Sequence, residues 1–246
     1  MVESKQQNSI VPYKAEYYRL YHYPLCPFSR SIRFLFNYYA IEHIQIVENF
    51  WEKREKFIAL NPTGEVPFLA IKRINIDDTT KHSLVWSHSV IKDWIRDKMK
   101  NNIIDIDEFQ DKIEINKMTY WFDVKFYNDV TKHILNERVY TWYKSQITPD
   151  AQLLKIARLN LENHLKFLET VLTKRDYVAT NEFSTADISA SMQLSCLDYL
   201  GEINWKTYPM IKEWYMIIKS KPSFREFLYD NISNFKAPMW YRELDF

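Results

Sequence analysis

The stretch Tyr17-Tyr-Arg-Leu-Tyr-His-Tyr-Pro-Leu-Cys-Pro-Phe-Ser29 determines how the first part of the chain is expected to fold. Its first seven residues favour β-strands, and Pro24 ends the run. After Pro27, apolar side chains recur at helical spacing, at Ile32, Leu35, Phe36 and Tyr39. The sequence therefore predicts a strand that leads directly into an amphipathic helix, with Cys26 at the junction.

A cysteine at the start of a helix is a candidate catalytic residue. The unpaired backbone N–H groups and the helix dipole stabilise a thiolate there, so they lower the pKa of the thiol. The same position would let a glutathione thiolate rest against Cys26 or Ser29. Alternatively, Cys26 is a small residue that fills a turn, and the residues alone leave both interpretations open.

The residues that follow alternate between strand and helix patterns. We expect a strand at 44–47, a helix at 51–60, strands at 66–76 and 82–86, and a helix at 89–99. This order indicates a small α/β domain over residues 17–97. Residues 1–16 are expected to form a flexible N-terminal extension.

From residue 106 onward the strand pattern disappears. Apolar residues recur at helical spacing over 106–144, 149–173, 184–200, 208–220 and 223–230. The first of these ranges is long enough for one bent helix or two. The sequence therefore predicts an all-helical domain over 106–230, after a linker at 98–105 and before a non-periodic tail at 231–246.

Composition excludes several classes of function. Among 246 residues, Lys and Arg number 33 and Asp and Glu 32, so no overall charge favours nucleic acid or an anionic membrane. Two glycines are too few for a glycine-rich phosphate-binding loop, and two cysteines are too few for a disulfide scaffold. The six histidines lack the spacing of metal ligands, and no apolar run could span a bilayer. We therefore expect a soluble cytoplasmic protein without a metal, a nucleic-acid partner or a membrane partner.

Two further motifs stand out. Asn61-Pro-Thr-Gly-Glu-Val-Pro67 contains a candidate cis bond between Val66 and Pro67. A cis bond there would turn the Val66 backbone outward, where it could pair with a peptide-like ligand; the alternative is a tight turn before a strand. Ser184-Thr-Ala-Asp187 fits a capping box at the start of a helix, which is a structural role.

In this order the motifs resemble those of the glutathione S-transferase superfamily. They are Pro24-Leu-Cys-Pro-Phe-Ser-Arg30, Asn61-Pro-Thr-Gly-Glu-Val-Pro-Phe-Leu69, Phe183-Ser-Thr-Ala-Asp187 and Lys219-Ser-Lys-Pro-Ser-Phe224. The resemblance covers roughly residues 17–230. It implies the fold of that superfamily, a thioredoxin-like α/β domain followed by an all-α domain.

The resemblance also implies roles for single residues. Cys26 or Ser29 takes the catalytic position, Pro67 is the cis-proline, and Val66 pairs with the cysteinyl part of glutathione. As an enzyme the protein would be a glutathione-dependent transferase or, through a Cys26 mixed disulfide, a thiol transferase.

One position departs from the superfamily pattern. Members carry an acidic residue followed by Ser where the γ-glutamyl end of glutathione is held, and Ser87 and His88 stand there in this chain. Loss of a charge-assisted hydrogen bond worth about 1.5–3 kcal/mol is expected to weaken glutathione binding roughly ten- to a hundredfold. Ser87 and Ser89 still offer hydroxyl groups.

The second half of the chain resembles the FzlA family more closely. These are bacterial glutathione-transferase-like proteins that associate with the tubulin homologue FtsZ in cell division. The resemblance rests on Trp121-Phe-Asp-Val-Lys-Phe126, Asn136-Glu-Arg-Val139, Leu197-Asp-Tyr-Leu-Gly-Glu202, Pro222-Ser-Phe-Arg225, Pro238, Tyr241 and Leu244-Asp-Phe246. Members are dimers that act on FtsZ filaments, so the resemblance implies a homodimer with FtsZ as partner rather than a conjugating enzyme.

The tail is the first candidate for an interaction surface. Trp240, Tyr241, Asp245 and Phe246 are the residues expected to contact a partner, because aromatic side chains anchor many interfaces. Alternatively, the aromatic tail packs back on its own domain. The sequence does not separate these two arrangements.

Overall fold

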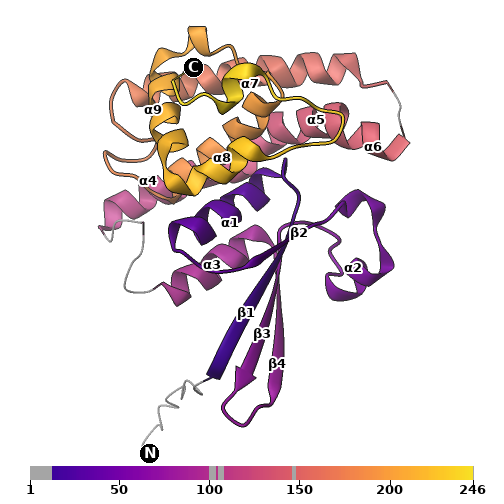
Figure 1. Cartoon of the computed structure of the whole chain (residues 1–246). Coiled ribbons are helices and arrows are strands. Elements are labelled where there is room, and N and C mark those ends of the chain that lie inside the picture. The colour runs from indigo at the N-terminus through magenta and orange to yellow at the C-terminus, as the bar shows by residue number, and fades with distance from the viewer. Residues whose placement is uncertain (1–12, 100–103, 105–107, 146–147, 246) are drawn as a thin grey trace, which may run out of the picture.

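The computed structural model describes residues 13–99, 104, 108–145 and 148–245. Figure 1 shows a sheet-containing N-terminal domain beneath a helical C-terminal domain. The four strands are β1 (Tyr13–His22), β2 (Ile44–Val47), β3 (Phe68–Asn75) and β4 (Thr80–Trp86), in the order β2-β1-β3-β4. β2 runs parallel to β1, whereas β3 and β4 are antiparallel to their neighbours. The fold is that of glutathione S-transferases, as the sequence predicted.

Helices pack on both faces of the sheet. α1 (Pro27–Tyr38) and α3 (His88–Lys98) cover the face that carries Tyr18, whose ring meets Phe36 and Trp94 edge to face. α2 (Glu55–Leu60) covers part of the opposite face, where Phe57 packs on Phe68. These contacts bury the alternate side chains of the central strands.

Two boundaries in this domain differ from the prediction. β1 begins at Tyr13 rather than Tyr17, because residues 13–16 extend the pairing with β3. The helix expected at 51–60 is interrupted at Lys53, which has a φ of +47° and separates the 3-10 turn η1 (Phe50–Glu52) from α2. The apolar spacing carried no signal for that left-handed residue.

The C-terminal domain begins with one continuous helix from 109 to 145. It consists of α4 (Phe109–Tyr120), the π-helical η2 (Trp121–Thr131), α5 (Lys132–Leu135), the π-helical η3 (Asn136–Tyr140) and α6 (Thr141–Ser145). π-Helical turns are uncommon and frequently mark functional sites. Here they set the direction of the side chains that face the first domain.

The remaining helices pack around α8. They are α7 (Ala151–Leu172), α8 (Thr185–Tyr199), η4 (Trp205–Thr207), α9 (Pro209–Ser220), η5 (Pro222–Tyr229) and η6 (Met239–Arg242). The predicted capping box is confirmed, since Asp187 accepts a hydrogen bond from the Ser184 backbone N–H at 2.9 Å. No helix among these described residues has the length and apolar character needed to cross a lipid bilayer.

A buried guanidinium joins the two domains. Arg30 of α1 is fully buried, and its Nη1 donates to Ser195 Oγ of α8 at 2.8 Å and to the Tyr241 hydroxyl of η6 at 3.0 Å. Its Nε donates to the Pro24 carbonyl at 2.6 Å. Arg30 therefore ties the start of α1 to α8 and to the C-terminal tail.

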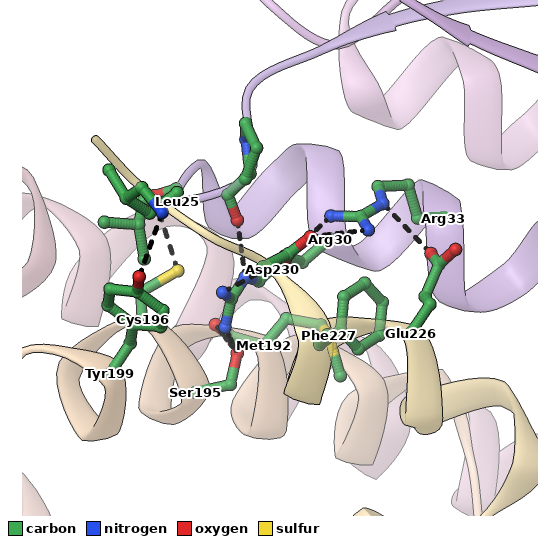
Figure 2. A network of polar contacts seen from close by, with 12 residues as sticks. Leu25, Arg30, Arg33, Met192, Ser195, Cys196, Tyr199, Glu226, Phe227 and Asp230 are labelled. Atoms are coloured by element: carbon green, nitrogen blue, oxygen red, sulfur yellow. Dashed lines mark hydrogen bonds and ion pairs between the residues drawn. The ribbon is translucent and has the colours of Figure 1, made fainter. Parts of the chain in front are cut away.

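Asp230 is the carboxylate that balances this charge. Both Nη atoms of Arg33 reach it at 2.9 Å, and Arg30 Nη2 lies 3.4 Å away (Figure 2). The Nε of Arg33 pairs with Glu226 at 2.9 Å. The last turn of the helical domain is thus held against the first helix of the chain.

Replacing Asp230 with Asn is expected to destabilise the whole chain. Removal of one partner from a buried ion pair costs about 3–5 kcal/mol, because the remaining charges stay buried without a counter-ion. Urea unfolding measures this loss. The matched control is Asp93→Asn, which removes an exposed partner 3.0 Å from Arg96 and is expected to cost under about 1 kcal/mol. Equal losses in the two variants would contradict this account of the network.

Candidate functional site

Cys26 caps the first turn of α1 and faces the Val66-Pro67 loop. Its Sγ accepts a hydrogen bond from the Ser29 backbone N–H at 3.4 Å and donates to the Val66 carbonyl at 3.6 Å. The side chain is buried, with 6% of its surface exposed. Burial raises the pKa of the Cys26 thiol and outweighs the hydrogen bonds from the helix start. The expected lowering of the pKa is therefore wrong, because the thiol is enclosed.

Ser29 points into the protein interior. It is fully buried, and its hydroxyl accepts a hydrogen bond from the Tyr23 backbone N–H at 3.4 Å. The hydroxyl thus serves the junction between β1 and α1. Cys26 and Ser29 lie on the same turn, as predicted, but both are engaged within the chain.

The Val66-Pro67 peptide bond is cis, which confirms the prediction for this motif. Gly64 precedes it with a φ of +65°, and the Asn61 side chain donates to the Glu65 carbonyl at 2.7 Å. Val66 and Pro67 are both buried, and the Val66 carbonyl already accepts the Cys26 thiol.

Ser87 and His88 lie at the start of α3. Ser87 is exposed with a φ of +68°, and its hydroxyl shares a hydrogen bond with that of Ser89 at 2.9 Å. The His88 ring stacks on Phe28 at 4.2 Å, and its Nε2 lies 3.3 Å from a carboxylate oxygen of Asp123. The side chain at the second predicted position is therefore directed toward the helical domain.

Asp123 is a site residue that the sequence reasoning missed. The π-helical η2 presents it to α3, where Lys92 Nζ binds it at 2.8 Å and also donates to Ser189 at 3.0 Å. Burial favours the protonated form, but Lys92 and His88 together hold the pKa of Asp123 well below its usual range. Its only signal in the sequence was a lone carboxylate within the aromatic run that begins at Trp121.

Aromatic side chains connect the domains around Cys26. Phe28 meets Tyr127 of η2 at 4.6 Å, and Tyr23 meets Trp51 at 4.8 Å, between ring centroids. Trp51 in turn stacks on Tyr143 of α6 at 5.2 Å. The region where a transferase would hold a hydrophobic co-substrate contains packed rings of the chain itself.

The tail residues separate into two groups. Tyr241 was predicted to contact a partner, but it is fully buried between Arg30 and the Phe227 carbonyl, to which it donates at 3.1 Å. This corrects the prediction, since the buried guanidinium needs that hydroxyl. Trp240 remains 40% exposed while its Nε1 donates to Asp198 at 3.2 Å.

The end of the tail is open to solvent. Leu244 and Asp245 are exposed, whereas the predicted contact at Phe246 lies outside the described residues. Trp240, Leu244 and Asp245 are therefore the tail positions that the described structure leaves accessible.

Comparison with known proteins assigns both halves of the chain. The model of the glutathione S-transferase N-terminal domain matches residues 25–97, and that of the C-terminal domain matches residues 134–222. The chain is 30% identical to FtsZ-localized protein A of Caulobacter vibrioides (strain NA1000 / CB15N) over 230 residues, 92% of this chain and 97% of that protein.

Solved structures agree with these matches. FzlA from C. crescentus superposes with a TM-score of 0.86 at 29% identity, covering 94% of this chain and 100% of that one. A glutathione S-transferase from Rhodospirillum rubrum F11 superposes with a TM-score of 0.83 at 30% identity, covering 93% and 100%.

Both cysteines are expected to resist alkylation in the folded protein. Cys26 and Cys196 are buried, and burial raises the pKa of each thiol. Iodoacetamide at pH 7.5 should label less than about one tenth of the thiols in the time that fully labels urea-unfolded chain. Mass spectrometry of the Cys196→Ala variant isolates Cys26. Rapid labelling of that variant without denaturant would show an accessible thiolate.

Proposed function

Because this chain belongs to the glutathione S-transferase family, we propose that it uses that fold as a dimeric, FtsZ-filament-binding regulator of cell division. The observation that carries the proposal is the match to FtsZ-localized protein A, which extends over 97% of that protein and includes both domains. A match of this extent covers potential contact surfaces as well as the shared fold. We place the protein in the cytoplasm, where two unpaired cysteines remain reduced.

The residues assigned to glutathione by resemblance do not fit that ligand well. Cys26 is enclosed and donates to Val66, and Ser29 is bonded to the backbone of β1. No carboxylate stands at Ser87 or His88. The nearby Asp123 is neutralised by Lys92. These contacts support binding of a protein partner over glutathione chemistry as the main function.

An exposed apolar stripe supports the dimer. Phe109, Ile113, Tyr120 and Val124 recur at helical spacing along α4 and η2, and Phe109 and Tyr120 are 71% and 63% exposed. Contiguous exposed apolar surface of this kind marks association sites. We propose that this stripe, named here the α4 stripe, packs against a second copy. A dimer would present two FtsZ contacts, and the second would form at high effective concentration on a filament.

Binding to FtsZ is expected to depend on the accessible tail and not on the thiol. A chain that ends after Arg242 keeps the buried Tyr241 and loses only Glu243 and the residues that follow it. It should lose at least about tenfold in affinity for FtsZ filaments, measured by co-sedimentation. Cys26→Ala should bind as the unaltered chain does.

Titration with reduced glutathione tests the alternative. As an enzyme the chain would bind glutathione calorimetrically at micromolar to low-millimolar concentration, and Cys26→Ala or Ser29→Ala would remove turnover with an electrophile. Failure of the unaltered chain to sediment with FtsZ filaments, together with such turnover, would replace the proposal with a transferase function.

Tyr120→Glu is expected to convert a dimer to monomer. A charge placed in the centre of the α4 stripe must be desolvated in the interface, whereas it stays in water in the monomer. Sedimentation velocity should show the mass fall by half with unchanged circular dichroism. The control is Tyr229→Glu, an equally exposed tyrosine on η5, away from the stripe. A monomeric parent chain would contradict the dimer.

A further inference from the structure

One face of the sheet carries a row of exposed side chains beyond α2. Figure 1 shows β1, β3 and β4 extending away from the helices. The antiparallel pairing sets side chains next to one another across the three strands in the rows Tyr17–Lys72–His82, Arg19–Ala70–Leu84 and Tyr21–Phe68–Trp86. We name as the open face its six exposed members, Tyr17, Arg19, Lys72, His82, Leu84 and Trp86.

The open face is basic and aromatic, and it lacks acidic residues. Arg19 and Lys72 are exposed, and neither forms an ion pair within the described part of the chain. Glu16, on the neighbouring strand position, points to the opposite face and is bound there by Arg73 and Lys98. Two unpaired cations beside exposed rings therefore face solvent without a counter-charge.

The edge of the same sheet is also available. β4 is the outermost strand, and no further described strand pairs with its free side. It contains neither Pro nor Gly, so its backbone groups are regularly spaced. An unpaired strand edge accepts an extended chain through backbone hydrogen bonds.

We propose that the open face and the edge of β4 bind an extended acidic peptide with an apolar residue between its carboxylates. Added beside β4, such a peptide directs alternate side chains over the open face, about 7 Å apart, as the rows of the sheet are. Its carboxylates would meet Lys72 and Arg19, and its apolar side chain would lie on Leu84 and Trp86. The site goes beyond the proposed FtsZ contact at the tail.

A peptide fits better than the other occupants. Single-stranded nucleic acid would place a phosphate at every nucleotide against only two permanent cations, and it cannot use the strand edge. The chain's own residues 1–12 contain one Glu and one Lys, so they carry no acidic surplus to match the open face.

The test uses a synthetic probe, a fluorescein-labelled Thr-Asp-Thr-Phe-Thr-Glu-Thr peptide, and fluorescence anisotropy on the full chain. Lys72→Glu and Arg19→Glu should each weaken binding at least tenfold, and added salt should weaken binding to the unaltered chain. The matched control is Lys81→Glu. This exposed lysine lies on β4 beside His82 but points to the opposite face, so its variant should change affinity less than twofold.

Four results would overturn the proposal. They are absence of binding to the unaltered chain at millimolar peptide, equal loss in Lys72→Glu and Lys81→Glu, tighter binding of an oligo-dT strand than of the peptide, and a change of oligomeric state in Lys72→Glu. The last two would assign the open face to nucleic acid or to a second copy. Circular dichroism of each variant separates these results from misfolding.

Discussion

The buried guanidinium of Arg30 is the constraint on which the arrangement of the molecule depends. A charge without access to water is tolerated only when its donors are paired and a counter-charge is close. Here the partners come from segments far apart in sequence: the turn at Pro24, α8 at Ser195, η5 at Asp230 and η6 at Tyr241. Because α1 starts at Cys26, the same contacts fix the site at the β1–α1 junction. Domains and tail are therefore parts of one packed unit.

The region that glutathione transferases use for chemistry is occupied by internal contacts in this chain. Cys26 bonds to Val66, Ser29 bonds to Tyr23, and His88 stacks on Phe28 beside Asp123. Each contact satisfies a polar group that a ligand would otherwise use, and aromatic rings fill the adjoining space. A scaffold arranged in this way retains rigid, accessible surfaces, which agrees with a role in binding proteins.

Local patterns were sufficient for much of the fold, because prolines, capping residues and apolar spacing act within a few residues of one another. They predicted the β1–α1 junction, the capping box at Ser184 and the cis bond before Pro67. They failed where distant segments decide the outcome. The burial of Tyr241 follows from Arg30, and the raised pKa of Cys26 follows from its enclosure. Neither effect has a signature near the residue concerned.

The separation of 200 residues between Arg30 and Asp230 has a consequence for synthesis on the ribosome. At about 5–20 residues per second, some 10–40 s pass between translation of the two residues. During that interval the first domain can form its sheet, but Arg30 and Arg33 have no carboxylate from η5 to pair with. The nascent chain must hold these two cations in water until its last helices emerge. Final docking of α1 is therefore a late event, which coincides with release of the completed chain.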